Sequence, residues 1–554
     1  MFKNCLVILA ASKIKPDFET VFNTVPSMLP FNGKPLIYHV IMNFVQENDG
    51  PVVVALPAGE EHIEKFLKVT LGSRLEIYVK YFEQAKPYCQ METLLGCMQF
   101  MEEKGLKDMP MQVANGDIYF EISPEKCQKE IVAWVDVPTA VGTYSKFIEK
   151  ENGYKYIRVG ASKLPPVEEA NSYTDCGVYS IPSWKKLQSL CAARNVECTV
   201  GEFIASACTK NALRLEYIKR WDDLGNLDSA TKISTKILGA REFNSIKVDE
   251  KRGTIRKSSD RNGEKILQEV NYYLSLPKPL SIFFPRLYDF SVGKKTWYEL
   301  EYYPYKTLSE YFVMRELSEH YWERIFNKIF EIKSEFEKIK QSKPTYEQYY
   351  KIYIGKLKER MERLKQQEKL FQLTELPKIV VNGKELLGWK YYIPFIESIV
   401  KKQYSRVECC AIHGDMCFSN ILYEPKADLI RFIDPRGEFY EEGIYGDPMY
   451  DLAKLMHSVH GGYDFILHEM YVLNEINPRS FEFKLIQSNS SLKVKDILLS
   501  RLRNKYSDSE IRTILVFEAL LFLTMLPLHS DDYKRQEAFY ITSLMIFNQA
   551  DKYY

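Results

Sequence analysis

The chain has 554 residues, of which 45% are hydrophobic and 27% are charged, and its formal net charge is +1. This length and apolar content suffice for two or three buried cores of about 100–200 residues each, so we expect a folded multidomain protein. The near-neutral charge, without a basic run or an arginine-rich stripe, gives no support for nucleic acid as a partner.

The first 235 residues alternate between apolar strands and helices. Strands are expected at residues 6–11, 52–56, 112–117 and 213–218, with a helix opening at residues 34–41. The third of these strands delivers Asp117 to its end, and Asp223 follows the fourth. Such alternation predicts an α/β domain with a parallel, doubly wound sheet, which binds ligands at the carboxyl ends of its strands.

This part of the chain resembles the sugar-phosphate nucleotidyltransferases, which join a nucleotide to a phosphorylated sugar or alcohol. The likeness rests on residues 9–11, 28–36, 116–117, 175–179 and 221–225. It implies that Asp117 and Asp223 hold the Mg²⁺ that bridges the phosphates of an NTP such as CTP and of the substrate. The alternative for either aspartate alone is a turn residue at the end of a strand.

The loop after the first strand departs from that family, whose loop is glycine-rich and carries an arginine. Residues 12–18 contain neither glycine nor arginine, and Pro26 stands where the family has a lysine. Glycine-turn amides normally cradle the triphosphate, and a cation offsets charge in the transition state. Lys13 or Lys15 is the candidate replacement, and Lys34 is a further candidate nucleotide-binding residue. Otherwise this domain binds its ligand without turning it over.

If the H-G-D-x-x-x-x-N stretch that starts at His413 belongs to a kinase-like fold, an ATP-clamping small lobe should precede it, and residues 240–303 have that order of elements. Strands are expected at 240–248 and 253–258, followed by a helix over 264–274. Lys257 on the second strand would face the phosphates, and Glu269 on the helix would pair with it. Taken alone, Lys257 reads as a solvated surface lysine; its place in this order favours the nucleotide-binding role.

The rest of this lobe is expected to hold adenine. Residues 297–303, which include Glu299 and Glu301, are predicted to form the strand and hinge, with backbone groups making the contacts to the base. No G-x-G-x-x-G loop is present, and residues 249–253 offer a single glycine. Phosphate cover is therefore expected from a shorter hairpin, and the base specificity is not readable.

The most informative segment is the H-G-D-x-x-x-x-N stretch that starts at His413, followed by Asp434 after an apolar strand at residues 429–433. A phosphoryl group passing to an alcohol requires a carboxylate that accepts the hydroxyl proton, and oxygen ligands that hold Mg²⁺. Asp415, Asn420 and Asp434 supply this set. The alternative is an Asx-rich turn between two strands.

This arrangement resembles the aminoglycoside phosphotransferase and choline kinase family, relatives of the protein kinases. The resemblance implies ATP as phosphoryl donor, Asp415 as catalytic base, and Asn420 and Asp434 as Mg²⁺ ligands. Asp447 and Asp451 match the acidic helix start that follows in that family and are interpreted as structural props. Residues 315–375 are helical in pattern, and such an insert covers the acceptor pocket in this family or is a plain structural helix pair.

The remaining features point to a cytoplasmic protein without a membrane span. Eleven scattered cysteines without C-x-x-C pairs favour reduced thiols over disulfides or a zinc site. Residues 5–11 are only a strand's length and lack a leader's charge and cleavage pattern. Residues 514–528 carry Glu518 and Pro527 and fall short of the about 20 residues that span a bilayer, so a core helix is expected.

Together these patterns predict two domains. Residues 1–235 form the nucleotidyltransferase-like domain and residues 236–554 an α+β kinase-like domain, with a small lobe over about 240–303 and a large lobe over about 304–554. We expect a bifunctional enzyme that phosphorylates a small alcohol, amino alcohol or sugar and activates the product to an NDP- or CDP-linked precursor, similar to fusions that serve bacterial capsule synthesis. The alternatives are a kinase with a silent front module and a sensor or scaffold without activity. A homo-oligomer is left open.

Overall fold

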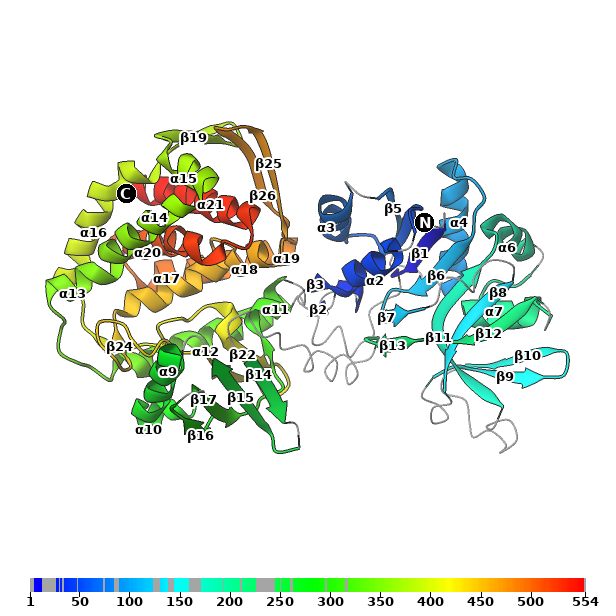
Figure 1. The fold of residues 1–554 in the computed structure, drawn as a ribbon, viewed down its shortest axis with the longest axis horizontal. Coiled ribbons are helices and arrows are strands. Elements are labelled where there is room, and N and C mark those ends of the chain that lie inside the picture. Colours follow the sequence, from blue (N-terminus) through cyan, green and yellow to red (C-terminus); the bar gives the residue numbers. More distant parts are fainter. Residues whose placement is uncertain are drawn as a thin grey trace. The chain divides into compact units, whose positions relative to one another are not determined.

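The computed structural model describes residues 4–552 except for several internal segments. Those outside the description are residues 12–25, 29, 32–33, 47, 73–74, 84–88, 123–129, 138–143, 159–170, 193, 210–211, 226–244, 250, 260–262, 294–295 and 314–316. The chain divides into two compact units, residues 1–237 and 238–554. Figure 1 shows both units.

The first unit is built on a nine-stranded sheet. Its main strand order is β10-β9-β11-β6-β1-β4-β5, with β8 pairing β11 and β12 pairing β8. The strands are β1 (Cys5–Leu9), β4 (Val52–Pro57), β5 (Ile77–Phe82), β6 (Met111–Asn115), β8 (Ile131–Asp136), β9 (Lys146–Lys150), β10 (Gly153–Ile157), β11 (Ser172–Ile181) and β12 (Leu213–Tyr217).

The sheet is mixed rather than parallel, which corrects the prediction. Strands β5, β4, β1 and β6 are parallel neighbours, whereas β11 runs antiparallel to β6, β8 and β9. A parallel pair requires a long crossover, whereas an antiparallel pair does not, and β11 pairs antiparallel with β9 of the β9–β10 hairpin. An apolar run in the sequence has no direction, so the pattern alone did not reveal this reversal.

Helices cover the sheet of the first unit. They are α2 (Leu36–Val45), α3 (Glu61–Leu71), α4 (Gln90–Glu103), α6 (Trp184–Cys191) and α7 (Val200–Ala207), with short elements η1 (Pro26–Met28), β2 (Pro30–Phe31) and β3 (Lys34–Pro35) before α2. Alternate residues of β1, such as Val7, join a core with Leu94 and Met98 of α4. The neighbouring Ile8 is also buried, so both faces of β1 are covered, as in doubly wound folds.

The second unit begins with a four-stranded antiparallel sheet of order β14-β15-β17-β16. These strands are β14 (Ser245–Asp249), β15 (Thr254–Ser259), β16 (Leu287–Ser291) and β17 (Thr296–Glu301), and helices α9 (Gly263–Ser275) and α10 (Lys278–Ser281) follow β15. Helix α9 packs on β15 and β17, drawn in green in Figure 1. The predicted strand at 240–248 is described only from Ser245, since residues 240–244 lie outside the described residues.

The remainder of the second unit is mainly helical. Its helices are α11 (Leu308–Val313), α12 (Glu319–Glu337), α13 (Tyr346–Tyr350), η3 (Lys351–Gly355), α14 (Lys356–Arg363), η4 (Leu364–Gln366), α15 (Glu368–Glu375), η5 (Trp389–Tyr392), α16 (Ile393–Arg406), η6 (Phe418–Asn420), α17 (Pro448–Val459), α18 (Tyr463–Leu467), α19 (Asn489–Lys505), α20 (Asp508–Met525), η7 (Leu526–His529) and α21 (Tyr533–Asp551). Its strands are β18 (Lys306–Thr307), β19 (Lys378–Val381), β20 (Lys384–Leu387), β21 (Cys410–Ala411), β22 (Ile421–Glu424), β23 (Leu429–Phe432), β24 (Tyr445–Gly446), β25 (Tyr471–Asn477) and β26 (Ser480–Leu485).

Helix α20 corrects one expectation about length. With the turn that follows, it covers 22 residues, 508–529, and it is the one helix in the described part of the chain that is long and apolar enough to cross a membrane. Its capping box at Ser507 and Glu510 starts it earlier than the apolar run suggests. However, 78% of its apolar window is buried within the unit, and Glu518 in its middle contacts the ring of His460 at 3.0 Å. Such burial is typical of a core helix.

Candidate functional site

The catalytic-loop segment of the second unit brings Asp415 and Asn420 together. Asn420 donates from Nδ2 to Oδ2 of Asp415 at 3.0 Å and to its backbone carbonyl at 2.9 Å. Lys454 of α17 places its Nζ 2.8 Å from Oδ1 of Asp415. Burial acts to lower the pKa of Lys454, but Asp415 and Tyr450 hold it above its usual value, so the lysine is charged. Each oxygen of the Asp415 carboxylate is thus held in place by a neighbouring side chain.

The loop is fixed by a buried carboxylate and a buried imidazole. Asp451 accepts hydrogen bonds from the backbone N–H groups of His413 and Gly414, both at 2.8 Å. Burial lowers the pKa of His413 to about 4, so its ring is neutral. Its Nδ1 accepts from the N–H of Asp415 at 3.2 Å, and its Nε2 donates to the carbonyl of Ile433 at 3.1 Å. The imidazole therefore ties Asp415 to the strand end that precedes Asp434.

Asp434 contacts Lys257, which forms the predicted ion pair with Glu269. Lys257 of β15 lies with its Nζ 2.8 Å from Oε2 of Glu269 and 3.0 Å from Oδ1 of Asp434. The hydroxyl of Tyr298 donates to the same Glu269 oxygen at 2.6 Å. Burial acts to lower the pKa of Lys257, but Asp434 and Glu269 hold it above its usual value. Asp434 itself has φ +53°, in the left-handed region that non-glycine residues rarely adopt.

A mainly apolar cavity of about 120 Å³ lies beside these charges. It is lined by Ile246, Ile255, Lys257, Pro285, Tyr298, Leu300, Glu301, Tyr302, Tyr303, Tyr305, Leu422, Ile433 and Asp434. Glu301 is at this cavity, but Glu299 is not. The register pairs Arg256 with Glu299 and Lys257 with Tyr298, so alternation places Glu299 on the opposite face, where it meets Arg256 at 2.9 Å. Only the backbone of Glu299 remains for the expected hinge role.

Asp447 has the structural role expected from the sequence. Its Oδ1 accepts from the N–H of Met449 at 2.9 Å and caps α17. Its Oδ2 accepts from the buried hydroxyls of Tyr349 at 2.6 Å and Tyr353 at 3.1 Å. Asp447→Ala would leave both phenols unpaired and α17 uncapped, so we expect the free energy of unfolding of the second unit to fall by about 3–4 kcal/mol. Urea denaturation followed by fluorescence measures this loss.

The exposed Asp496 on α19 provides the matched control for this measurement. Asp496→Ala removes a carboxylate of the same size without a buried partner, so its effect is expected within about 0.5 kcal/mol of zero. An Asp447→Ala protein as stable as the parent would contradict the capping role.

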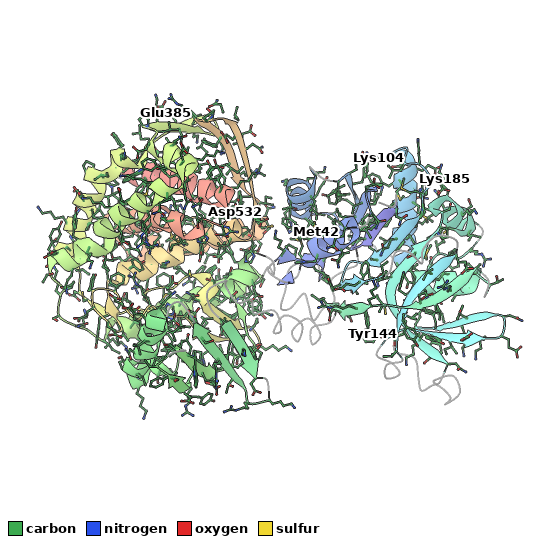
Figure 2. All side chains as sticks on the ribbon, in the orientation of Figure 1. Met42, Lys104, Tyr144, Lys185, Glu385 and Asp532 are labelled. Atoms are coloured by element: carbon green, nitrogen blue, oxygen red, sulfur yellow. The ribbon has the colours of Figure 1, made fainter. Side chains whose placement is uncertain are left out.

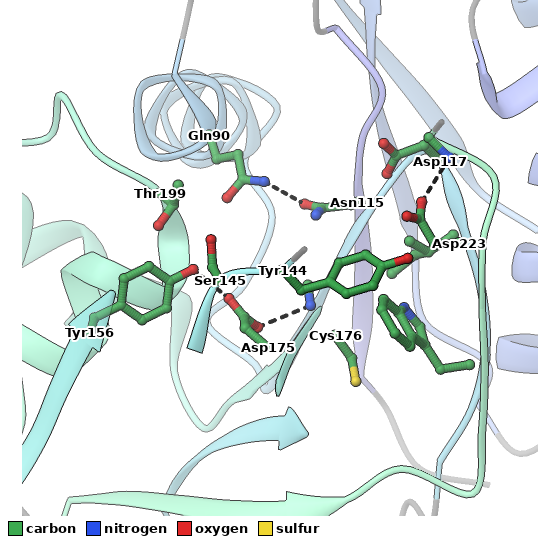
Figure 3. A pocket seen from close by; sticks show the side chains of 14 residues that line it. Gln90, Asn115, Asp117, Tyr144, Ser145, Tyr156, Asp175, Cys176, Thr199 and Asp223 are labelled. Atoms are coloured by element: carbon green, nitrogen blue, oxygen red, sulfur yellow. Dashed lines mark hydrogen bonds between the residues drawn. The ribbon is translucent and has the colours of Figure 1, made fainter. Parts of the chain in front are cut away.

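In the first unit, the two predicted metal-binding aspartates converge (Figure 3). Asp117 follows β6, and Asp223 ends β13 (Arg220–Asp223), which pairs with β7 (Ile118–Glu121). A Cβ added at Gly225 would lie 2.3 Å from Oδ2 of Asp117 and 3.0 Å from Oδ1 of Asp223. Both carboxylates therefore border the same space, and only glycine leaves it open.

These aspartates line a cavity of about 340 Å³. The lining residues that the structure describes are Gln90, Asn115, Asp117, Ile118, Tyr144, Ser145, Tyr156, Asp175, Cys176, Gly177, Thr199, Trp221, Asp223 and Gly225. Tyr144, labelled in Figure 2 and Figure 3, packs edge-on against Trp221 with ring centroids 4.9 Å apart. The cavity thus combines aromatic walls with carboxylate and amide groups, which suits a polar ligand with a ring.

Two hydrogen-bonded groups shape the deep side of this cavity, and sequence reasoning missed both. Asp175 accepts from the hydroxyls of Tyr156 and Tyr179, each at 2.7 Å. Gln90, the first residue of α4, donates to Oδ1 of Asn115 at 3.1 Å. No pattern along the chain links these residues; the nearest signal was the segment around Asp175 that carries the nucleotidyltransferase resemblance.

Other predicted site residues of the first unit lie elsewhere. Lys34 is on β3 with its Nζ 4.4 Å from the ring centroid of Tyr38, and it is not among the lining residues. Lys13 and Lys15 lie outside the described residues. Among the lining residues that the structure describes there is no lysine or arginine. Within the same described part of the chain, no three histidine, cysteine or acidic side chains form a metal cage.

Comparisons with known proteins found similar solved structures only. No protein-family model and no curated protein matches the chain. A nucleoside-diphosphate-sugar pyrophosphorylase from Vibrio cholerae aligns at 15% identity with a TM-score of 0.33, over 41% of this chain and 98% of its own. An inositol-1-phosphate CTP transferase from T. maritima aligns at 14% identity with a TM-score of 0.32, over 44% of this chain and 99% of its own.

A UDP-glucose pyrophosphorylase from Acinetobacter baumannii gives a similar result, with 14% identity and a TM-score of 0.32 over 43% of this chain and 93% of its own. At these identities and TM-scores the likeness assigns no activity to this chain.

Proposed function

We propose that the second unit is an ATP-dependent phosphotransferase that acts on a small-molecule hydroxyl. The observation that carries this proposal is the convergence of Lys257, Glu269 and Asp434, which are far apart in the sequence, beside an apolar cavity. Phosphoryl transfer depends on this kind of charged constellation, because catalysis consists mainly of positioning and charge stabilisation. Asp415 and Asn420 complete it, linked to Asp434 through His413.

The donor set fits a Mg²⁺–nucleotide. The apolar cavity suits an adenine ring, and Lys257, fixed by Glu269, supplies positive charge for the phosphates. The side chain of Asp434 is 43% exposed, and the amide of Asn420 donates to Asp415, which leaves its carbonyl oxygen for a metal. Two such oxygens fit Mg²⁺, which keeps several waters. When bound there, Mg²⁺ would screen the charge of the transferring phosphoryl group.

Asp415 takes the part of general base. Its carboxylate accepts the proton of the acceptor hydroxyl as the oxygen bonds to the γ-phosphorus and ADP leaves. Lys454 and Asn420 hold the carboxylate in place. The products are a phosphomonoester and ADP.

We propose further that the first unit is a nucleotidyltransferase that uses this phosphomonoester. Asp117 and Asp223 would hold Mg²⁺ at the cavity, where the ion screens the attack of one phosphate on another. A phosphate oxygen of the monoester bonds to the α-phosphorus of an NTP such as CTP, and pyrophosphate leaves. Lys13 or Lys15 is our candidate for the cation of this step. A cytoplasmic role in making an NDP- or CDP-linked capsule precursor fits both activities.

One observation favours a second candidate for the first unit. Because the described residues that line its cavity include no lysine or arginine, the unit could bind a ligand without supplying charge to a transition state. In that case the protein is a small-molecule kinase with a silent binding module.

The phosphotransferase proposal predicts a specific loss in Lys257→Met. The buried ammonium would no longer offset phosphate charge, so we expect kcat/KM for ATP to fall by about 10²-fold or more.

In Asp434→Asn, half-maximal rate should require more Mg²⁺, because the metal would lose an anionic ligand. ADP release measured across a Mg²⁺ titration tests both. Lys265→Met, at an exposed position on α9, is the control. An Asp434→Asn protein with the parent's rate and Mg²⁺ dependence would rule out Asp434 as the ligand.

A further inference from the structure

Four cationic side chains gather around Tyr450, and one of them, Lys454, contacts Asp415. Lys356 and Arg360 are four positions apart on α14, so they share one helix face. Tyr450 and Lys454 are likewise four positions apart on α17. Arg436, two residues after Asp434, donates from Nη1 to the hydroxyl of Tyr450 at 3.2 Å. We call Lys356, Arg360, Arg436 and Lys454 the cationic cluster.

The hydroxyl of Tyr450 shows that the cluster surrounds one point. Burial acts to raise the pKa of Tyr450, yet Lys356, Arg436 and Lys454 together lower it below its usual value. Three separate elements thus direct positive charge at a single buried phenol.

The cluster is crowded with like charge. Tyr450 acts to raise the pKa of Lys356. However, burial and the charges of Arg436, Lys454 and Arg360 lower this pKa to about 8. Burial, Arg363 and Arg436 lower the pKa of Arg360, with Glu359 opposing them. Such mutual repulsion is unfavourable unless an anion relieves it.

Two acidic side chains near the cluster already have a partner: one is held by Arg363, and the other by a member of the cluster. Glu359 pairs with Arg363 at 2.6 Å, and Asp415 pairs with Lys454 at 2.8 Å. The Nε and Nη1 atoms of Arg360 are buried without a hydrogen-bond partner in the part of the chain that the structure describes. Buried guanidinium donors are rarely left unpaired, so an unpaired set beside a catalytic base points to a ligand that brings the acceptor oxygens.

Resting on the phosphotransferase role proposed above, we propose that the acceptor is an anionic alcohol, whose carboxylate or phosphate binds Lys356, Arg360 and Arg436 while its hydroxyl lies at Asp415. Arg360 offers planar donors that match either anion. Arg436 already donates from Nε to the carbonyl of Glu438 and from Nη1 to Tyr450, so it and Lys356 contribute positive charge. A cationic amino alcohol would meet repulsion from the same groups. The proposal therefore narrows the acceptor class expected from the sequence.

Matched acceptors test the charge preference. ADP release is measured with Mg²⁺–ATP and glycerate, glycerol 3-phosphate, glycerol or ethanolamine, and with gluconate, glucose 6-phosphate, glucose or glucosamine. In each series, kcat/KM for the preferred anionic acceptor should exceed kcat/KM for the neutral and cationic acceptors by about 10²-fold. This is the effect expected of two charge-assisted contacts. The carboxylate and phosphate arms show which anion is preferred. A neutral or cationic acceptor used as well as its anionic counterpart would overturn the inference and leave the kinase intact, whereas no ADP release with any acceptor would count against the phosphotransferase itself.

Variants locate the anion. Arg360→Gln and Lys356→Met are each expected to raise KM for the anionic acceptor by about 10- to 100-fold, with KM for ATP unchanged. Arg360→Lys, which keeps the charge, should recover part of the loss and shows that the fold is intact. Lys358→Met, at an exposed position on the same helix, is the control. A rise in KM for ATP with an unchanged acceptor KM would assign the cluster to the nucleotide and overturn the proposal.

Discussion

Replacing Asp415 with asparagine is expected to lower kcat for phosphoryl transfer by about 10²- to 10⁴-fold while KM for ATP stays close to the parent value. The amide keeps the size of the side chain but does not accept the hydroxyl proton. Because Asp415 is held by Lys454 at 2.8 Å and Asn420 at 3.0 Å, its position is set by the loop and not by the nucleotide. The loss should therefore appear in the chemical step.

The measurement is steady-state ADP release at saturating ATP, together with the ATP-induced rise in melting temperature. An unchanged rise shows that the variant still binds nucleotide. Asp496→Asn, exposed on α19, makes the same chemical change away from the loop and should leave both readings unaltered. If Asp415→Asn keeps near-parent turnover, Asp415 is not the general base. The cationic cluster would then not place an acceptor hydroxyl at a catalytic carboxylate.

Much of the second unit was predictable because local signals and chain order agree there. The helix expected at 264–274 is α9, Gly263–Ser275, since its apolar residues recur at helical spacing and Glu269 falls on the buried side. Asp434 follows β23 as expected, because an apolar run delivers the next polar residue to the end of its strand. These elements depend on contacts close in the sequence.

The surroundings of Asp415 were not predictable in the same way. Lys454 and Arg436 are charged residues that a pattern assigns to solvent, and only packing of α17 against the catalytic loop reveals their contacts. Lys356 and Arg360 lie in a stretch rich in lysine and glutamate, where a buried cation looks like its exposed neighbours. The expected acceptor, a small alcohol, amino alcohol or sugar, followed from family resemblance, and the proposed anion site disfavours the amino alcohol among these.

In the first unit, residues at strand ends were easier to predict than strand direction. Asp117 and Asp223 each follow an apolar run, so both were expected at the ligand edge, and they converge beside Gly225. The antiparallel β11 was missed because burial on both faces makes parallel and antiparallel strands look alike in sequence. The hydrogen bond from Tyr156 to Asp175 joins two strands of this sheet, and the sequence of neither strand indicates it.

Asp117→Ala and Asp223→Ala are each expected to stop pyrophosphate release from an NTP and the phosphorylated acceptor, a fall in rate of at least about 10³-fold. Each removes one of the two carboxylates that we propose would hold Mg²⁺ at the cavity, so the ion would be bound more weakly and would screen less of the phosphate charge. The adjacent Asp222 is the matched control, since its carboxylate meets Arg220 at 2.8 Å and does not line the cavity. Asp222→Ala should keep the parent rate.

Gly225→Ala provides an independent test of the same geometry. Its new Cβ would lie 2.3 Å from Oδ2 of Asp117, so the methyl group displaces the carboxylate without altering either aspartate, and pyrophosphate release should fall with theirs. Phosphoryl transfer at Asp415 should continue in all three variants, because residues of separate pockets act independently.

Pyrophosphate release is assayed with all four nucleotides, using the kinase product as acceptor. A parent protein that phosphorylates its acceptor but releases no pyrophosphate with any nucleotide would establish the first unit as a binding module, and the absence of a lysine or arginine among its described cavity residues would then be the physical reason.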